Sequence, residues 1–156
     1  MRLIVFSHVW LMKNKISLIE IVDKSIDWKN AIKLGVDLLV KNNIATSELS
    51  NAIIDSTLKM GPYYILMPKV ALAHTAPGEY NKKVGLSLIL FKKPIKFSDN
   101  ERHQVNLLFT LSAIDSDSHM NILVKFSELF SSDSILEQSL RCKSKEELVN
   151  IFGELL

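Results

Sequence analysis

A chain of 156 residues, 47% of them hydrophobic, has the size of one globular domain and can bury a core. Its formal net charge of +2, without a long lysine or arginine cluster, argues against a nucleic-acid partner. The only cysteine, Cys142, excludes an internal disulfide and points to a cytoplasmic protein.

Residues 1–15 differ in character from the rest of the chain. The segment MRLIVFSHVWLM begins like a signal sequence, with Arg2 before an apolar run, but it lacks a small-residue cleavage site. Lys13 and Lys15 end the run well short of the ~20 residues that span a membrane. We interpret residues 1–15 as an N-terminal extension, either an extra edge strand or the result of a misplaced start codon, and His8 as structural or incidental. The single domain is expected over residues 16–156.

The first part of this domain predicts one strand and two helices. Apolar residues from Ile16 to Val22 favour a short strand. Asp27 is placed to cap a helix that has Trp28 as a core anchor and ends at Asn42-Asn43. A second helix is expected from about 46–47 to Met60, with Gly61 as its C-cap.

The middle of the chain predicts short strands and one well-placed histidine. The stretch GPYYILMPKVALAH, residues 61–74, indicates two apolar strands separated by a turn at Met67-Pro68. The second strand delivers His74, and the turn residues Thr75-Ala76-Pro77-Gly78 follow it directly. Strands are also expected at 84–91 and 95–97. In the first of these, the small residues Gly85 and Ser87 suggest that another segment approaches closely, and we expect the His74 loop there.

The last part predicts a central strand followed by helices. Residues 104–114 alternate most clearly and carry apolar residues on both faces, which is typical of a strand covered on both sides. Ser118 is predicted to cap the next helix, with His119 in its first turn. Two further helices are expected at 134–140 and 145–155, the second with a capping box from Ser144 to Glu147. The pattern is that of one α/β domain, with helices over a small mixed β-sheet.

His74 and His119 are the candidate functional residues. Each alone is equally consistent with a capped surface residue or a partner in a hydrogen-bond network. A helix N-terminus, however, favours a bound phosphate and disfavours the imidazolium form of a nearby histidine. If the two rings converge, one can carry a phosphoryl group while the other donates a hydrogen bond to it, without a metal.

Other chemistries find less support. Zinc binding by the histidines with Asp115 or Asp117 lacks a close HxxxH or CxxC spacing. The chain has no nucleophile elbow for a hydrolase, and no glycine-rich loop for a nucleotide. His103, which follows a charged loop, is interpreted as a surface residue.

Several motifs together resemble a known family. They are DWKNAIKL (27–34), GPYYILMPKVALAH (61–74), GLSLILFKKPIKF (85–97) and AIDSDSHMNILVKFSELF (113–130). In this order they are similar to the enzyme IIA domains of the bacterial phosphoenolpyruvate-dependent sugar phosphotransferase system (PTS), in the mannitol/fructose class. Within that class the chain looks closest to the ascorbate-type branch. The resemblance runs from about residue 16 to the C-terminus.

This resemblance implies a three-layer α/β domain that works without a metal or other cofactor. His74 would accept a phosphoryl group from phospho-HPr on its tele nitrogen, and His119 would stabilise it. The group would then pass to the cysteine of an enzyme IIB, and on to a sugar that enters through a membrane enzyme IIC. The alternative is a regulatory domain of the same fold, whose phosphorylation state controls a protein partner. Neither role excludes a homodimer.

The chain also departs from the family around the acceptor. Ala73 replaces the usual proline before the histidine, and Thr75-Ala76 follows it where an arginine is common. An arginine would bind phosphate through two hydrogen bonds. We expect Thr75 to bind the phosphoryl group in its place, and Ser118 to contribute from the start of its helix.

Overall fold

A five-stranded mixed sheet forms the centre of the computed structural model, which describes residues 14–156. The extension, with His8, therefore lies almost entirely outside the described residues. The strands are β1 (Ile19–Val22), β2 (Ile65–Met67), β3 (Lys69–Ala73), β4 (Gly85–Lys96) and β5 (Gln104–Ser112), arranged in the order β1-β4-β5-β3-β2. The pairs β1–β4 and β3–β5 are parallel, and the pairs β4–β5 and β2–β3 are antiparallel. The predicted mixed sheet is confirmed.

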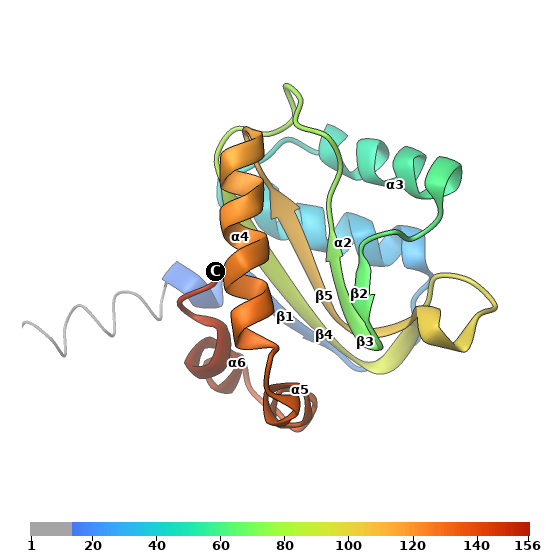
Figure 1. The fold of residues 1–156 in the computed structure, drawn as a ribbon, viewed down its shortest axis with the longest axis vertical. Coiled ribbons are helices and arrows are strands. Elements are labelled where there is room, and N and C mark those ends of the chain that lie inside the picture. Colours follow the sequence, from blue (N-terminus) through green and yellow to red (C-terminus); the bar gives the residue numbers. More distant parts are fainter. Residues whose placement is uncertain (1–13) are drawn as a thin grey trace, which may run out of the picture.

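Helices cover both faces of the sheet (Figure 1). They are α2 (Trp28–Lys41), α3 (Glu48–Met60), α4 (Ser116–Leu129), α5 (Asp133–Leu140) and α6 (Lys145–Phe152), with a 3-10 turn η1 at Glu101–His103. In Figure 1, α2 crosses behind the strands and α4 runs in front of them. The result is a three-layer domain, as the family resemblance implied.

Two neighbouring residues of β5 show why this strand lies at the centre. The ring of Phe109 packs against Phe126 of α4 and Phe152 of α6, with centroid separations of 5.1 and 5.2 Å. Successive side chains of a strand point to opposite faces. Thr110 accordingly faces the other layer, where it meets Gly35 of α2. The prediction of a strand covered on both sides is confirmed.

Small residues bring α2 close to the sheet. A Cβ atom on Gly35 would lie 2.2 Å from Thr110 Oγ1, and Ser87 Oγ donates a 2.7 Å hydrogen bond to the Gly35 carbonyl. A Cβ atom on Gly85 would meet Ile44 at 2.9 Å. The expectation that the loop after β3 approaches Gly85 and Ser87 is therefore wrong. Their small size serves α2 and the segment that follows it.

The helix ends follow the sequence signals closely. The Asp27 side chain accepts the Asn30 N–H, and α2 ends before Asn43, which has φ 58°. Gly61 terminates α3 with φ 75°, a conformation that glycine adopts at low cost. Trp28 is half-buried and packs against Phe97. No helix within residues 14–156 is long and apolar enough to span a membrane.

Several predicted boundaries differ from the structure, among them the start of β1, which is Ile19 and not Ile16. The strands expected at 84–91 and 95–97 form the single strand β4, in which a register shift between Leu90 and Ile95 accommodates Pro94. Helix α6 ends at Phe152 instead of Leu155. Its N-cap is Ser144, as expected, but the Glu147 carboxylate accepts the N–H of residue 143 and does not close the predicted box.

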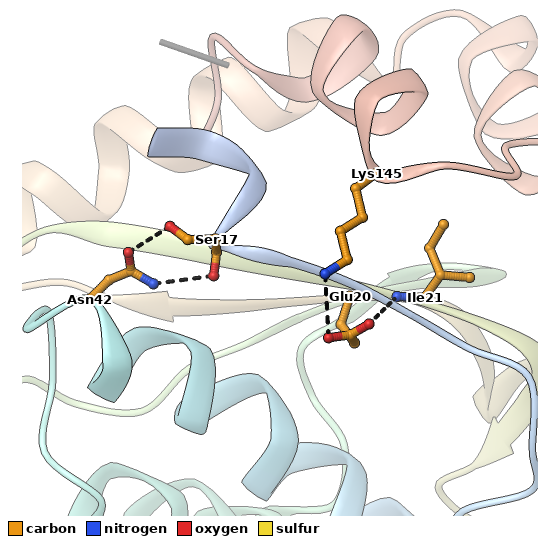
Figure 2. Close-up of polar contacts among 5 residues, drawn as sticks. All are labelled: Ser17, Glu20, Ile21, Asn42 and Lys145. Atoms are coloured by element: carbon orange, nitrogen blue, oxygen red, sulfur yellow. Dashed lines mark hydrogen bonds and ion pairs between the residues drawn. The ribbon is translucent and has the colours of Figure 1, made fainter. Parts of the chain in front are cut away.

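Polar contacts fix the first strand of the domain (Figure 2). Ser17 donates a hydrogen bond to the Asn42 side chain at 2.7 Å, and Asn42 Nδ2 donates to the Ser17 carbonyl at 3.2 Å. This reciprocal pair joins the segment just before β1 to the C-cap residue of α2. An ion pair of 3.6 Å between Glu20 and Lys145 joins β1 to α6, and its exposure makes it a minor contribution to stability.

Candidate functional site

The parallel pairing of β3 and β5 brings the two candidate histidines together. His74 follows the last residue of β3, and α4, which carries His119, begins shortly after β5 ends. Because neighbouring parallel strands end at the same edge of a sheet, both segments emerge side by side, at the upper side of the sheet in Figure 1. The imidazole centroids are 4.6 Å apart, and the ring planes are inclined by 52°.

One ring nitrogen of His74 is engaged within its own strand. Nδ1 lies 2.7 Å from the carbonyl oxygen of Leu72. A carbonyl only accepts hydrogen bonds, so the contact requires the proton on Nδ1 and leaves an unprotonated Nε2 in the neutral ring. Nε2 therefore has a free lone pair, as a nucleophile needs.

The surroundings of His74 favour this neutral form. Burial lowers its pKa, the hydrogen bond to Leu72 opposes that change, and the charge of His119 lowers the pKa further. The side chain is nevertheless only half-buried, so that it can be reached from solvent. A neutral and accessible imidazole at neutral pH is suited to nucleophilic attack.

The start of α4 differs from the sequence prediction. Its N-cap is Asp115, whose carboxylate accepts the Ser118 N–H at 2.8 Å, while the Ser118 hydroxyl lies 3.3 Å from the Asp115 N–H. The prediction of Ser118 as the N-cap is therefore wrong, and His119 is the fourth residue of the helix. Its N–H donates to the Asp115 carbonyl and is not free for a ligand. The four residues 115–118, Asp-Ser-Asp-Ser, are all able to cap a helix, and the first of them, Asp115, is the N-cap.

An open cavity of about 410 Å³ surrounds the two histidines. The chain segments after β3 and at the start of α4 supply most of its lining, together with one aromatic residue that precedes β2. The lining residues are Tyr63, His74, Thr75, Ala76, Pro77, Asp115, Ser116, His119 and Met120. Thr75 lines the cavity, as does Ser116, whereas Ser118 does not.

Two residues beside His74 carried no functional signal in the sequence. Tyr63 donates a hydrogen bond of 2.6 Å to the His74 carbonyl, and its ring meets the imidazole edge-on at a centroid separation of 5.4 Å. Ser56, on α3, shares a 2.7 Å hydrogen bond with the Thr75 hydroxyl. Tyr63 lies within the GPYYILMPKVALAH motif, but no pattern assigned it a role, and the helical position of Ser56 offered no signal either.

The third histidine of the described residues and the cysteine lie away from the cavity. His103 ends η1, where its Nδ1 lies 2.7 Å from the Ser98 hydroxyl. Cys142 is buried between α5 and α6. Among residues 14–156, no group of three or more histidine, cysteine, aspartate or glutamate side chains is arranged to hold a metal ion.

Comparison with known proteins decides the family. The family described as "Phosphoenolpyruvate-dependent sugar phosphotransferase system, EIIA 2" matches this chain over residues 12–154. The chain belongs to this family. It is thus a phosphotransferase-system component, as the motifs predicted. The ascorbate-specific PTS EIIA component of Escherichia coli K12 is 31% identical over 125 residues, which cover 80% of this chain and 81% of that protein.

Solved structures of EIIA domains share the fold. The mannitol-specific cryptic enzyme IIA CmtB of Escherichia coli matches with a TM-score of 0.80 and 37% identity, covering 88% of this chain and 93% of CmtB. Enzyme IIAMTL from Escherichia coli, in its complex with phosphorylated enzyme IIBMTL, matches with a TM-score of 0.77 and 18% identity over 88% and 95% of the two chains. At that identity the second likeness concerns the fold alone.

Proposed function

We propose that His74 is the phosphoryl acceptor of this EIIA domain and carries the group on Nε2. The phosphoryl group comes from phospho-HPr and leaves to the cysteine of an enzyme IIB, which serves a membrane enzyme IIC. The observation that carries the proposal is the 2.7 Å contact between Nδ1 and the Leu72 carbonyl, because it leaves Nε2 as the free nucleophile.

Both transfer steps balance with groups that the proteins themselves supply. In the first, the Nε2 lone pair forms a bond to phosphorus while the bond between phosphorus and HPr breaks, and that electron pair stays on HPr. In the second, a cysteine thiolate of enzyme IIB attacks the phosphorus, and the Nε2–phosphorus electron pair returns to His74. Such steps depend mainly on positioning and on the stabilisation of charge.

His119 is the proposed stabiliser of the phosphoryl group. Its ring lies against that of His74, at 4.6 Å between centroids, and can donate an N–H to a phosphoryl oxygen. Thr75 lines the same cavity and offers a hydroxyl. Ser118 would have to release Asp115 before its hydroxyl could serve the same purpose, and its role in phosphate binding stays a prediction.

The proposed acceptor is an enzyme IIB of the ascorbate type in the cytoplasm. The curated relative at 31% identity is named as ascorbate-specific, whereas CmtB at 37% identity is named as mannitol-specific. The rates of phosphoryl transfer to purified ascorbate-type and mannitol-type enzymes IIB, measured in parallel, would distinguish the two assignments. Faster transfer to the mannitol-type enzyme would overturn the ascorbate assignment and leave the carrier chemistry intact.

An in vitro phosphorelay tests the carrier role itself. The protein is incubated with phosphoenolpyruvate, enzyme I and HPr, and examined by intact-mass spectrometry and site mapping. We expect one acid-labile phosphoryl group, on Nε2 of His74, that disappears when enzyme IIB is added. His103→Gln is a matched control, because that histidine lies away from the cavity and should leave labelling unchanged. A folded protein that stays unlabelled beside an active HPr would contradict the proposal.

A further inference from the structure

Three hydroxyl groups lie together on one side of His74. They belong to Ser56 on α3, to Tyr63 in the connection to β2, and to Thr75. The Tyr63 hydroxyl donates to the His74 carbonyl at 2.6 Å, and the Ser56 and Thr75 oxygens are 2.7 Å apart. Burial raises the pKa of Tyr63, while hydrogen bonds with Ser56 and Thr75 lower it to a lesser extent. The phenol is therefore protonated at neutral pH and close to both aliphatic hydroxyls.

Counting the hydrogens of this cluster shows what it can offer a ligand. Each hydroxyl carries one hydrogen that it can donate. The Tyr63 hydrogen is taken by the His74 carbonyl, and a second hydrogen lies between Ser56 and Thr75. The third hydrogen can be donated to the Tyr63 oxygen or to a ligand.

The position of Thr75 indicates where that hydrogen points. Thr75 lines the cavity that contains both histidines, whereas Ser56 reaches Thr75 from α3 and is not part of the lining. Ser56 Oγ shares its 2.7 Å hydrogen bond with Thr75 and also lies close to the Tyr63 hydroxyl. If Ser56 donates to Thr75, the remaining hydrogen belongs to Thr75, which can donate it into the cavity.

We propose that Ser56 is a positioning residue, which donates to Thr75 Oγ1 and thereby directs the Thr75 hydrogen towards a phosphoryl oxygen on His74. This inference rests on the proposed carrier function. It assigns to a helical serine a part of the phosphate recognition that an arginine after the histidine would otherwise supply. The arrangement acts on the phosphorylated state, because a charged phosphoryl oxygen is a stronger acceptor for the Thr75 hydrogen than the neutral Tyr63 oxygen.

The transfer equilibrium between phospho-HPr and this protein measures that contribution. Mixtures of known composition are brought to equilibrium, and the phosphorylated fraction of each protein is read by intact-mass spectrometry. We expect Ser56→Ala to shift the equilibrium constant towards phospho-HPr by about fivefold, and Thr75→Val by about tenfold. Because Ser56 acts through Thr75, the double variant should equal Thr75→Val alone.

Two further variants separate positioning from a general loss of structure. Ser56→Thr keeps the hydroxyl and should restore the equilibrium towards that of the unmodified chain. Ser50→Ala, on the same helix, removes a hydroxyl that bonds to the Ser47 carbonyl and should leave the equilibrium unchanged. Thermal unfolding of each variant shows that the compared proteins are folded at the assay temperature.

The outcomes distinguish this inference from the function on which it rests. An unmodified chain that HPr does not label would overturn the carrier role, and the inference with it. If the unmodified chain is labelled but Ser56→Ala has the same equilibrium constant, only the inference is wrong. If the change in the equilibrium constant of the double variant equals the product of the two single changes, the inference is also wrong, because Ser56 then acts independently of Thr75.

Discussion

Nδ1 of His74 lies 2.7 Å from the carbonyl oxygen of Leu72, two residues earlier in the chain. Strand β3 therefore positions the imidazole at its end and also determines which ring nitrogen carries the proton. Nε2 is left free, on a ring whose neighbour, His119, lies 4.6 Å away between centroids. In the function proposed above, the two histidines have separate roles, because His74 supplies the nucleophile and His119 the hydrogen-bond donor.

The separation of roles predicts different effects for two matched variants. His74→Gln should remove all labelling by phospho-HPr, since it removes the acceptor. His119→Ala should still be labelled on His74, but transfer to enzyme IIB should slow by about 10- to 100-fold, the cost of one hydrogen bond to a charged group. Rapid-quench measurements of both steps provide the test. Complete loss of labelling in folded His119→Ala would reverse the assignment.

The pKa of His74 predicts how stability depends on pH. Burial holds the folded pKa below 6.5, so the folded state binds fewer protons than the unfolded state in this range. The contribution of His74 to stability is then fully present above about pH 6.5 and is lost as the pH falls through the folded pKa. Urea unfolding of the unmodified chain should therefore show a steeper loss below pH 6.5 than that of His74→Gln.

A direct titration provides the control for this prediction. The His74 ring signals should titrate in NMR spectra with a midpoint below 6.5, and His119→Gln should raise that midpoint, because the charge of His119 contributes to the lowered pKa. A midpoint at or above 6.5 would show that burial does not determine the pKa of His74.

The sequence predicted those parts of the fold that depend on local signals. Asp27 begins α2 and Gly61 ends α3 as expected, because capping involves residues close in sequence. The start of α4 was misplaced because Asp115 and Ser118 are both good capping residues, and local chemistry alone does not rank them. Two strands were expected where β4 is continuous, because its pairing with β5 resumes after a register shift and depends on residues far apart in sequence.

The candidate site was predictable only in part, for a similar reason. His74 and His119 stood out by their positions at the ends of elements and by their family motifs. Their proximity depends on the parallel pairing of β3 with β5, which involves residues far apart in sequence. The contact between Ser56 and Thr75 arises in the same way, from a helix that packs beside the loop, and has no periodic signature.

Lys69 gives a prediction for the turn that leads into β3. Its φ of 74° lies in the left-handed region and follows Pro68, a combination typical of a type II turn. Lys69→Gly should raise the free energy of unfolding by about 0.5 kcal/mol, because relief of strain exceeds the added entropy of the unfolded chain. Lys69→Val should lower it by about 1 kcal/mol, since a β-branched residue adopts this conformation poorly. Urea titrations that give Lys69→Val a higher free energy of unfolding than Lys69→Gly would contradict this interpretation of the turn.

Gly35 gives the sharpest prediction about the packing of α2. A Cβ atom there would lie 2.2 Å from Thr110 Oγ1, which is fully buried at the centre of the sheet and makes no hydrogen bond among the described residues. Gly35→Ala should lower the free energy of unfolding by about 1–3 kcal/mol, because overpacking exceeds the gain in helix propensity. Asp37→Ala, at an exposed position of the same helix, is the control and should change stability far less.

A second substitution identifies the clash as the cause. In the Thr110→Ala background the hydroxyl that meets the new Cβ is absent, so Gly35→Ala should cost less there than in the unmodified chain. Chemical denaturation of the four proteins of this cycle gives the coupling free energy. Equal costs in both backgrounds would show that α2 relaxes away from the sheet, and that Gly35 is not needed for its close approach.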